Sequence, residues 1–178
     1  MLHRLFAALP VPEEIGDALL DLQKSLAGAS WRPLENFHIT LRYFGEVDTN
    51  TAREIDYELG QIEAGQLELE IDGMGWFGRR EPHAVWARIA PHRDLSRLAG
   101  ACERAARRLG LPKEPRAFKP HITLAHLHGT GLEETRAWTE RHGAYRDGPF
   151  WVDRFHLFES IATKGPSRYD PVADYPLL

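Results

Sequence analysis

The chain has 178 residues, with a hydrophobic content of 43% and a charged content of 27%, which are ordinary values for a soluble globular protein. Its 22 Lys and Arg residues are outnumbered by 26 Asp and Glu residues, and the net charge is −4. This balance excludes a protein that coats duplex nucleic acid by charge alone, so a nucleic-acid substrate would have to be held locally, at an end.

Cys102 is the single cysteine, so an intramolecular disulfide is excluded and a reducing cytoplasm is the expected location. It lies on the apolar stripe of a predicted helix, where we expect a buried structural thiol rather than a nucleophile. The N-terminus has no long apolar run with a cleavage site, and no apolar stretch of about 18 residues occurs. We therefore expect a cytoplasmic protein that does not enter a membrane.

The first part of the chain predicts two strands and two helices. An apolar run at residues 2–9 predicts a buried strand. Pro12 and two acidic residues open a helix that we expect to end at Gly28. A connector then leads into a strand over 37–44, which Gly45 is expected to stop. The capping-box pattern that begins at Thr51 predicts a helix over roughly 50–64.

The middle of the chain continues the alternation of strands and helices. Alternating apolar residues predict a half-exposed strand at 67–71, followed by a glycine-rich loop or bulge at 73–78. A further strand is predicted at 84–89. Asp94 is the expected cap of a helix that stops at Gly110.

The last part of the chain predicts a strand at about 118–127, a short helix at 131–143 and a strand at 150–158. Residues 169–178 are expected to be irregular or a short terminal strand. This order, with neighbouring strands joined like hairpins, favours an α+β fold with antiparallel sheets over a doubly wound parallel fold.

The tetrapeptide His-Ile-Thr-Leu occurs twice, beginning at His38 and at His121. Side chains alternate between the two faces of a strand, so His38 shares a face with Thr40, and His121 shares a face with Thr123. The isoleucine and leucine of each motif then point to the core. The pattern predicts two matched strands, each presenting one imidazole and one hydroxyl to a common cleft.

Two facing imidazoles suit a reaction that needs one general base and one general acid, because an unperturbed histidine titrates near 6.5. In-line displacement at phosphorus divides its proton transfers in this way. The hydroxyls of Thr40 and Thr123 can bind the non-bridging phosphate oxygens. Three cationic residues flank the motifs and could contact substrate, namely Arg42, Arg116 and Lys119.

Other interpretations stay open for several residues. A single histidine on a strand is more often structural than catalytic, and His126 with His128 forms a His-x-His pair that could bind a metal ion. No acidic or cysteine residues at recognisable spacing complete such a site, so we expect neither a metal nor another cofactor. Four aromatic residues are expected to serve packing, with base stacking at the rim of the cleft as the alternative, namely Trp31, Tyr43, Trp76 and Phe77.

The motifs and their surroundings resemble the 2H phosphoesterase superfamily. The likeness is closest to the bacterial and archaeal RNA 2′,3′-cyclic phosphodiesterases, historically called 2′-5′ RNA ligases. The segments that resemble this family are Arg4 to Ala8, Glu35 to Val47, Val85 to Ala87, Leu109 to Pro112, Arg116 to Ala125, and Glu159-Ser160 with Tyr169.

The resemblance implies a single bilobal domain over residues 1–178, with two sheet-and-helix lobes related by a pseudo-twofold axis and the active cleft between them. It implies metal-independent opening of 2′,3′-cyclic phosphate ends of RNA, or of such nucleotides, to 2′-phosphates, with a possible reverse ligation. His38 would be the proton donor and His121 the proton acceptor, while Thr40 and Thr123 would hold the phosphate. We expect a monomer.

One position departs from the family pattern. An arginine commonly follows the second motif where this chain has His126, so His126 is a further candidate for substrate contact, with affinity that is weaker or more dependent on pH. Two alternative functions remain: an RNA-end-binding module without turnover, and a related enzyme acting on 2′-5′-linked oligonucleotides or on ADP-ribose cyclic phosphate.

Overall fold

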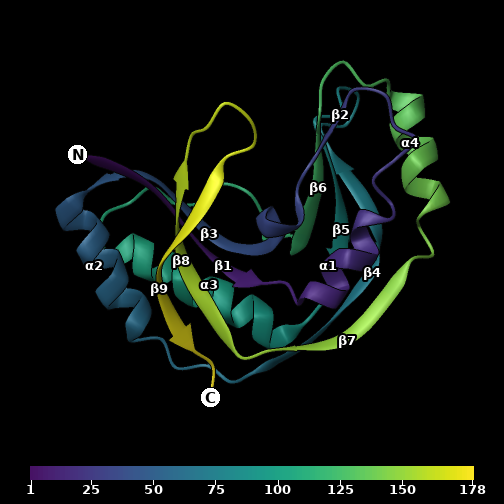
Figure 1. Cartoon of the computed structure of the whole chain (residues 1–178). Helices are drawn as coiled ribbons and strands as arrows, with labels where there is room; N and C mark the ends of the chain where they lie inside the picture. The colour runs from purple at the N-terminus through teal and green to yellow at the C-terminus, as the bar shows by residue number, and fades with distance from the viewer.

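The computed structural model describes all 178 residues and contains two antiparallel sheets with four α-helices and one 3₁₀ turn, η1 (Figure 1). The elements are β1 Leu2–Pro10, α1 Glu13–Leu20, β2 Ala29–Trp31, η1 Leu34–Asn36, β3 His38–Asp48, α2 Thr49–Gly60, β4 Leu67–Phe77, β5 Ala84–Ile89, α3 Arg93–Arg108, β6 His121–Leu127, α4 Leu132–Arg141, β7 Arg146–Val152, β8 Arg154–Ile161 and β9 Arg168–Pro176.

The two sheets have matching strand orders. One sheet has the order β3-β1-β8-β9, and the other has the order β6-β5-β4-β7 with β2 added at its outer edge beside β6. All of these neighbours are antiparallel. In each sheet, the strand that begins with a histidine motif lies next to a strand that precedes it in the chain: β3 pairs with β1, and β6 pairs with β5. The predicted α+β fold with two related lobes is confirmed.

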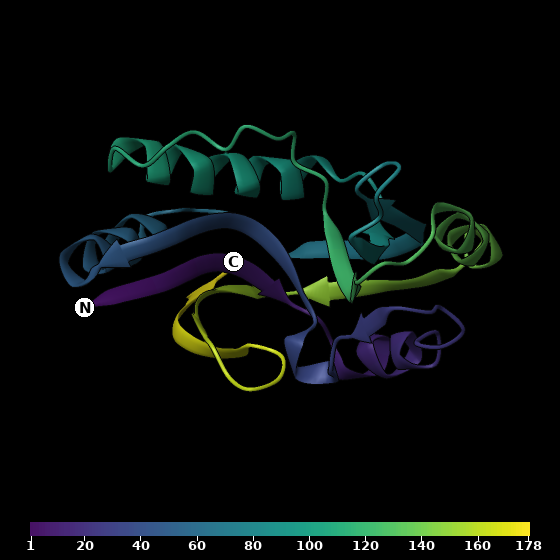
Figure 2. The ribbon, with the colours of Figure 1, turned by 90° about the horizontal axis from the view of Figure 1, so that it is seen from above.

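Helix α3 packs against the sheet of the other half of the chain. Although α3 connects β5 to β6 of the five-stranded sheet, it packs against β3 of the other sheet, where α2 also packs (Figure 2). Helix α4 packs against β4, and α1 lies on the same side of the molecule (Figure 1). Cys102 of α3 is fully buried in this packing, and burial raises the pKa of its thiol to about 12. The predicted structural thiol is therefore confirmed. None of the helices is long and apolar enough to cross a membrane.

The first helix is shorter than its sequence predicts. Helix α1 ends at Leu20, not at Gly28, because short turns after Leu20 lead to Ser25 in a left-handed conformation with φ of 64°. Leu26 still reaches the core, so the apolar stripe is buried without being helical there. Residues 29–31, expected to lie outside any strand, form β2 and pair with β6.

Two of the glycines that lie inside strands accompany irregularities in strand pairing. Gly45 was expected to stop the first motif strand, but β3 continues to Asp48, and the left-handed Gly45, with φ of 81°, accompanies a register shift against β1. Gly73, with φ of 84°, likewise accompanies a shift inside β4, which runs on to Phe77. The glycine-rich segment is therefore a bulge and not a loop.

Helix caps and the last strands also differ from expectation. The side chain of Asp48, not the Thr51 capping box, caps α2, and His92 rather than Asp94 caps α3 by accepting a hydrogen bond from the Leu95 amide. The predicted strand at 150–158 is two strands separated at Asp153, where the chain passes from one sheet to the other. The terminal segment is strand β9.

Candidate active site between the lobes

The two motif histidines are held in the same way. The Nδ1–H of His38 donates to the backbone oxygen of Asn36 at 2.8 Å, and that of His121 donates to the backbone oxygen of Lys119 at 2.5 Å. A carbonyl can only accept, so Nδ1 carries the proton in both rings. The Nε2 atom of each neutral imidazole is left with a free lone pair, which is the form a proton-transfer group needs.

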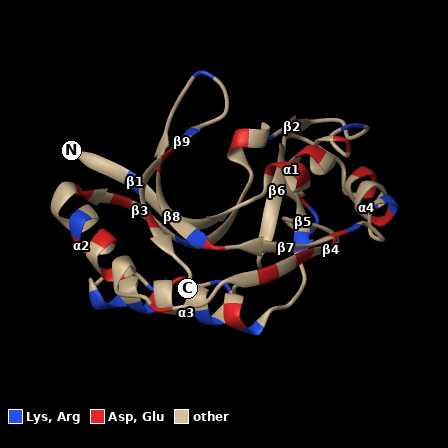
Figure 3. Cartoon of the chain, turned by 60° about the horizontal axis from the view of Figure 1, so that its bottom comes forward, with Lys and Arg blue, Asp and Glu red and all other residues tan.

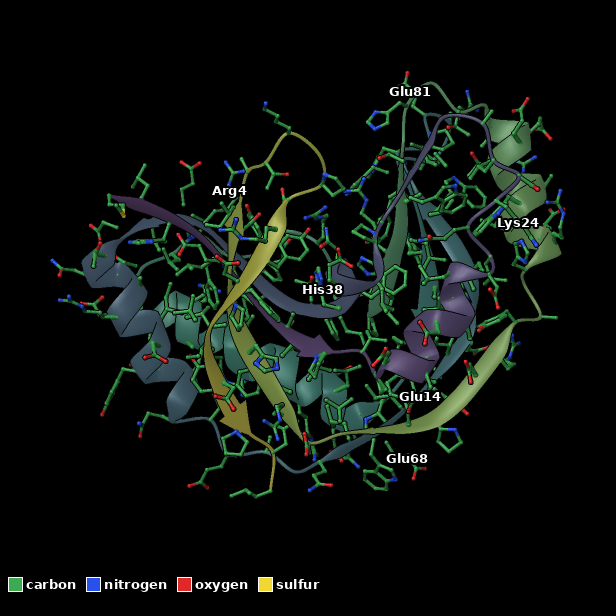
Figure 4. All side chains as sticks on the ribbon, in the orientation of Figure 1. Arg4, Glu14, Lys24, His38, Glu68 and Glu81 are labelled. Atoms are coloured by element: carbon green, nitrogen blue, oxygen red, sulfur yellow. The ribbon has the colours of Figure 1, made fainter.

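His38, labelled at the centre of Figure 4, lies in an aromatic environment. Its ring centroid is 4.9 Å from that of Phe6 and 5.1 Å from that of Tyr169, which meets it edge-on at 83°. Phe158 lies beyond, at 6.5 Å. Burial, together with a smaller contribution from the charge of His121, lowers the pKa of His38 to about 4. His38 is therefore neutral at neutral pH in the free protein.

His121 has a related but more open environment. Phe77 meets its ring edge-on at 86° and 5.0 Å, and Trp86 lies at 5.5 Å. Gly75 makes room for Trp86, because a Cβ atom at this position would lie 2.4 Å from the indole ring. Burial lowers the pKa of His121, and the nearby Arg116 lowers it as well.

The alternation predicted for the two motifs is present. Ile39, Leu41, Ile122 and Leu124 are buried, while both histidines and both threonines are half-buried. Strands β3 and β6 pack against each other although they belong to different sheets. The packing of β3 against β6 brings the two motifs together at the interface between the lobes.

A cavity of about 920 Å³ opens beside this pair, and it is lined by Thr40 from one lobe and by His121 from the other. Arg116 and Lys119, which flank the second motif in the sequence, also line it, and their expected contact with substrate stays a prediction. Arg107 and Lys113 were not predicted, because neither is near a motif in the sequence. The aromatic residues on its wall are Tyr43, Phe77 and Phe118.

His126 does not lie in this cavity. It lines a separate pocket of about 410 Å³ together with Arg32, His128, Lys164 and Tyr169. No group of three or more His, Cys, Asp or Glu side chains is arranged to hold a metal ion, so the His126 and His128 pair has no further ligands of these types.

Arg42 is not available as a free cation. It is 8% exposed, its Nε donates to Glu103 of α3 at 2.5 Å, and its two other nitrogens donate to the backbone oxygens of Tyr43 and Pro112. Arg42 nevertheless lines the large cavity, and its expected contact with substrate stays a prediction. An irregularity in the pairing of β1 with β3 turns Leu41 and Arg42 both inward, which explains the burial of Arg42.

Other aromatic residues divide between packing and the site. Trp31 packs against Trp138 at 5.8 Å, and Trp76 donates its indole N–H to the backbone oxygen of Arg79. Tyr43 and Phe77 line the large cavity. Tyr169, which contacts His38, has no local sequence signal for this role because it lies far away on β9.

Comparisons with known proteins agree with this arrangement. The family model described as LigT like phosphoesterase matches residues 9–86 and 89–167. An RNA 2′,3′-cyclic phosphodiesterase of Aeropyrum pernix is 35% identical over 74% of this chain and 77% of its own length, and one of Archaeoglobus fulgidus is 29% identical over 92% and 94%. The crystal structure of E. coli LigT complexed with 3′-AMP is similar at a TM-score of 0.80, with 25% identity and coverage of 99% of both chains.

Proposed function

Because this chain belongs to the LigT-like phosphoesterase family, we propose that it hydrolyses 2′,3′-cyclic phosphate ends of RNA to 2′-phosphate ends. The observation that supports this most is the pair of imidazoles from two lobes, each with Nδ1 bound to a carbonyl and Nε2 free. Such a pair supplies one base and one acid to a single phosphorus centre. The relatives named above act on this substrate.

In the proposed reaction, Nε2 of His121 takes a proton from the attacking water while His38 gives a proton to the leaving 3′ oxygen. The P–O3′ bond breaks as the new P–O bond forms, and the 2′ oxygen keeps the phosphate. Thr40 and Thr123, on the same strand faces as the histidines, donate hydrogen bonds to the non-bridging oxygens, where negative charge accumulates. All groups come from this one chain, so we propose a single bilobal domain that works as a monomer.

The role of His38 requires its pKa to rise when substrate binds. In the free protein the pKa of His38 is about 4, so the acid form is scarce at neutral pH. The negative charge of a bound phosphate favours the imidazolium and raises this pKa. The pKa values of the free protein alone would favour the reverse assignment, so the roles need a chemical test, described in the Discussion.

The function is tested with a cytidine 2′,3′-cyclic phosphate and an RNA oligonucleotide ending in a cyclic phosphate, both in excess EDTA. We expect hydrolysis with a bell-shaped pH profile, and phosphorus NMR should identify a 2′-phosphate product. Binding of the oligonucleotide without product would instead indicate an RNA-end-binding module. Cleavage only of 2′-5′-linked oligonucleotides or of ADP-ribose cyclic phosphate would indicate an enzyme of the same fold with a different substrate.

The large cavity favours the reverse reaction as a second activity. It lies on the side of His121, where the nucleophile enters, and its 920 Å³ exceed the space a water molecule needs. Lys113 and Arg107 on its wall can bind the phosphates of an RNA strand whose 5′-hydroxyl replaces water. Incubation of cyclic-ended RNA with 5′-hydroxyl RNA should then yield a 2′-5′ linkage, and substitution of Lys113 by glutamine should reduce ligation more than hydrolysis.

A further inference from the structure

The pocket that contains His126 has a wall from each lobe. Ser30, Arg32, His126 and His128 come from β2, β6 and the residues after them, and Lys164 to Ser167 come from the loop between β8 and β9. In Figure 1 this loop rises opposite the upper ends of β2 and β6. The volume of the pocket, about 410 Å³, is within the range of small-molecule sites.

The charge of this pocket is of one sign. Its titratable lining residues are Arg32, His126, His128, Lys164 and Tyr169, and no carboxylate is among them. The large cavity differs, because Glu103 and Glu114 line it. Figure 3 shows a cationic residue at the tip of the β8–β9 loop, in a chain that is acidic overall. A pocket with these side chains suits a phosphate group.

The pocket is joined to the surroundings of His38. Tyr169 lines it, and the ring of Tyr169 is 5.1 Å from that of His38. Ser167 lines it too, and its backbone oxygen accepts a hydrogen bond of 3.0 Å from the side chain of Asn36, the residue whose carbonyl holds His38. The pocket therefore lies on the His38 side of the pair, and the large cavity lies on the His121 side.

The side of the cleft matters because an RNA end has a direction, with the cyclic phosphate on the terminal ribose and the rest of the strand preceding it. In the proposed reaction His38 serves the leaving 3′ oxygen, which belongs to the terminal ribose, while water enters opposite to it. The ribose and the RNA that precedes it then leave the cleft on the His38 side. We infer that the 410 Å³ pocket is a second phosphate subsite, which binds the phosphodiester preceding the 3′-terminal nucleotide. This inference rests on the proposed function.

The subsite should depend on pH through His126. The groups that face His126 are Arg32, His128 and His83, with Lys164 on the opposite wall. Burial lowers the pKa of His126, and so do the neighbouring Arg32, His128 and His83. A bound phosphodiester, which stays anionic over the whole range, offsets this repulsion. Affinity for the preceding phosphate should therefore rise as the pH falls from about 8 to about 6.

The experiment compares two substrates, a cyclic mononucleotide and a dinucleotide that ends in the same cyclic nucleotide. The dinucleotide differs by one nucleoside and the phosphodiester in question. The quantity measured is the ratio of their kcat/KM values, in which effects on the chemistry at the cyclic phosphate cancel. We expect the ratio to exceed one in the wild type, and to be larger at about pH 6 than at about pH 8.

Three variants examine the pocket. Lys164→Gln should reduce the ratio about threefold to tenfold and lower the salt dependence of dinucleotide binding by about one charge. His126→Gln should remove most of the pH dependence of the ratio, whereas His126→Arg should keep the ratio high at both pH values. Lys24→Gln is the matched control, because Lys24 is not among the residues that line the pocket and lies near α4 (Figure 4).

The outcomes separate the subsite from the function itself. A wild-type ratio near one, or an equal fall of the ratio in Lys164→Gln and Lys24→Gln, would overturn the subsite while leaving the phosphodiesterase intact. Failure to hydrolyse either substrate would overturn the proposed function. A third substrate, the cyclic mononucleotide with a 5′-phosphate, distinguishes a preceding diester from a terminal phosphate: if only this substrate gains, the pocket binds terminal phosphates instead.

Discussion

The surroundings of His38 and His121 differ although both side chains stand in the same tetrapeptide. Each Nδ1 donates to the carbonyl two residues earlier, and each ring meets one aromatic edge, from Tyr169 or from Phe77. His38 is enclosed more completely, and its pKa is lowered to about 4. His121 opens to the large cavity.

This difference shows which part of the site repeats and which does not. The repeated motif fixes the tautomer of each imidazole and the orientation of its ring, because Nδ1 lies against the backbone carbonyl two residues earlier. The surroundings come from other elements: β9 supplies the edge against His38, and β4 supplies the edge against His121. Different roles for identical motifs are therefore possible without any change in the motifs.

The largest expected effect comes from removal of either imidazole. His38→Ala and His121→Ala should each lower kcat by about 10²–10⁴-fold, because general acid–base catalysis contributes on this scale. Hydrolysis of a cyclic mononucleotide measures the loss, and circular dichroism checks that the variants remain folded. Substantial turnover in one variant would remove that residue from the pair and end the comparison between two equivalent groups.

A change of leaving group should then separate the two roles. In a cyclic phosphorothiolate with sulfur at the 3′ bridging position, the leaving thiolate needs no proton. His38→Ala should recover about a hundredfold of its loss with this substrate, since it lacks only the acid, whereas His121→Ala should recover little. Recovery in His121→Ala alone would reverse the assignment of donor and acceptor, in line with the low pKa of His38 in the free protein.

The residue that follows the tetrapeptide differs between the two halves, and this difference predicts a loss of stability when Arg42 is replaced. Arg42 follows the first motif and is buried against Glu103, whereas Ala125 follows the second and is buried without a charge. Arg42→Ala should destabilise the protein by about 2–3 kcal/mol, because it strips two carbonyls and a partly exposed carboxylate of their donor.

Urea unfolding measures this change, and Arg4→Ala is the control. Arg4 also forms an ion pair, with Glu46 at 2.6 Å, but both side chains are about half exposed, so no measurable loss is expected. Equal stability of Arg42→Ala and the wild type would mean that Arg42 does not hold α3 against the first lobe.

The parts of the site that could be predicted are local. Period-two alternation placed His38 and Thr40 on one face, and the repeat of the tetrapeptide placed a second such pair beside it. The burial of Arg42 could not be predicted, because an irregular pairing with β1 changes the alternation after Thr40, and nothing in the sequence marks that position. Tyr169 belongs to the family resemblance, but its contact with His38 could not be predicted, since only the sheet order β3-β1-β8-β9 brings it there.

The fold was predictable to a similar extent. Hydrophobic periodicity located nearly all strands and helices, because it reports which face of each element is buried. The packing of α3 on the other lobe was not predictable, because the apolar stripe of α3 shows only that one face is buried and not against which sheet. The passage from β7 to β8 was hidden for the same reason, since both strands have apolar residues at period two.

The smallest expected effect is a pH dependence of stability, which should differ between His38 and His121. His38 binds its proton less readily when folded than when unfolded, because its pKa falls from 6.5 to about 4. The unfolded chain therefore binds more protons below 6.5, and His38 should cost about 2 kcal/mol of stability as the pH falls from 6.5 to about 5. Urea unfolding at both pH values should show this loss reduced in His38→Gln. His121→Gln should reduce it less, because the pKa of His121 is lowered by less. If both substitutions changed the loss equally, the two imidazoles would be equally enclosed, and their roles would have to be set by the substrate alone.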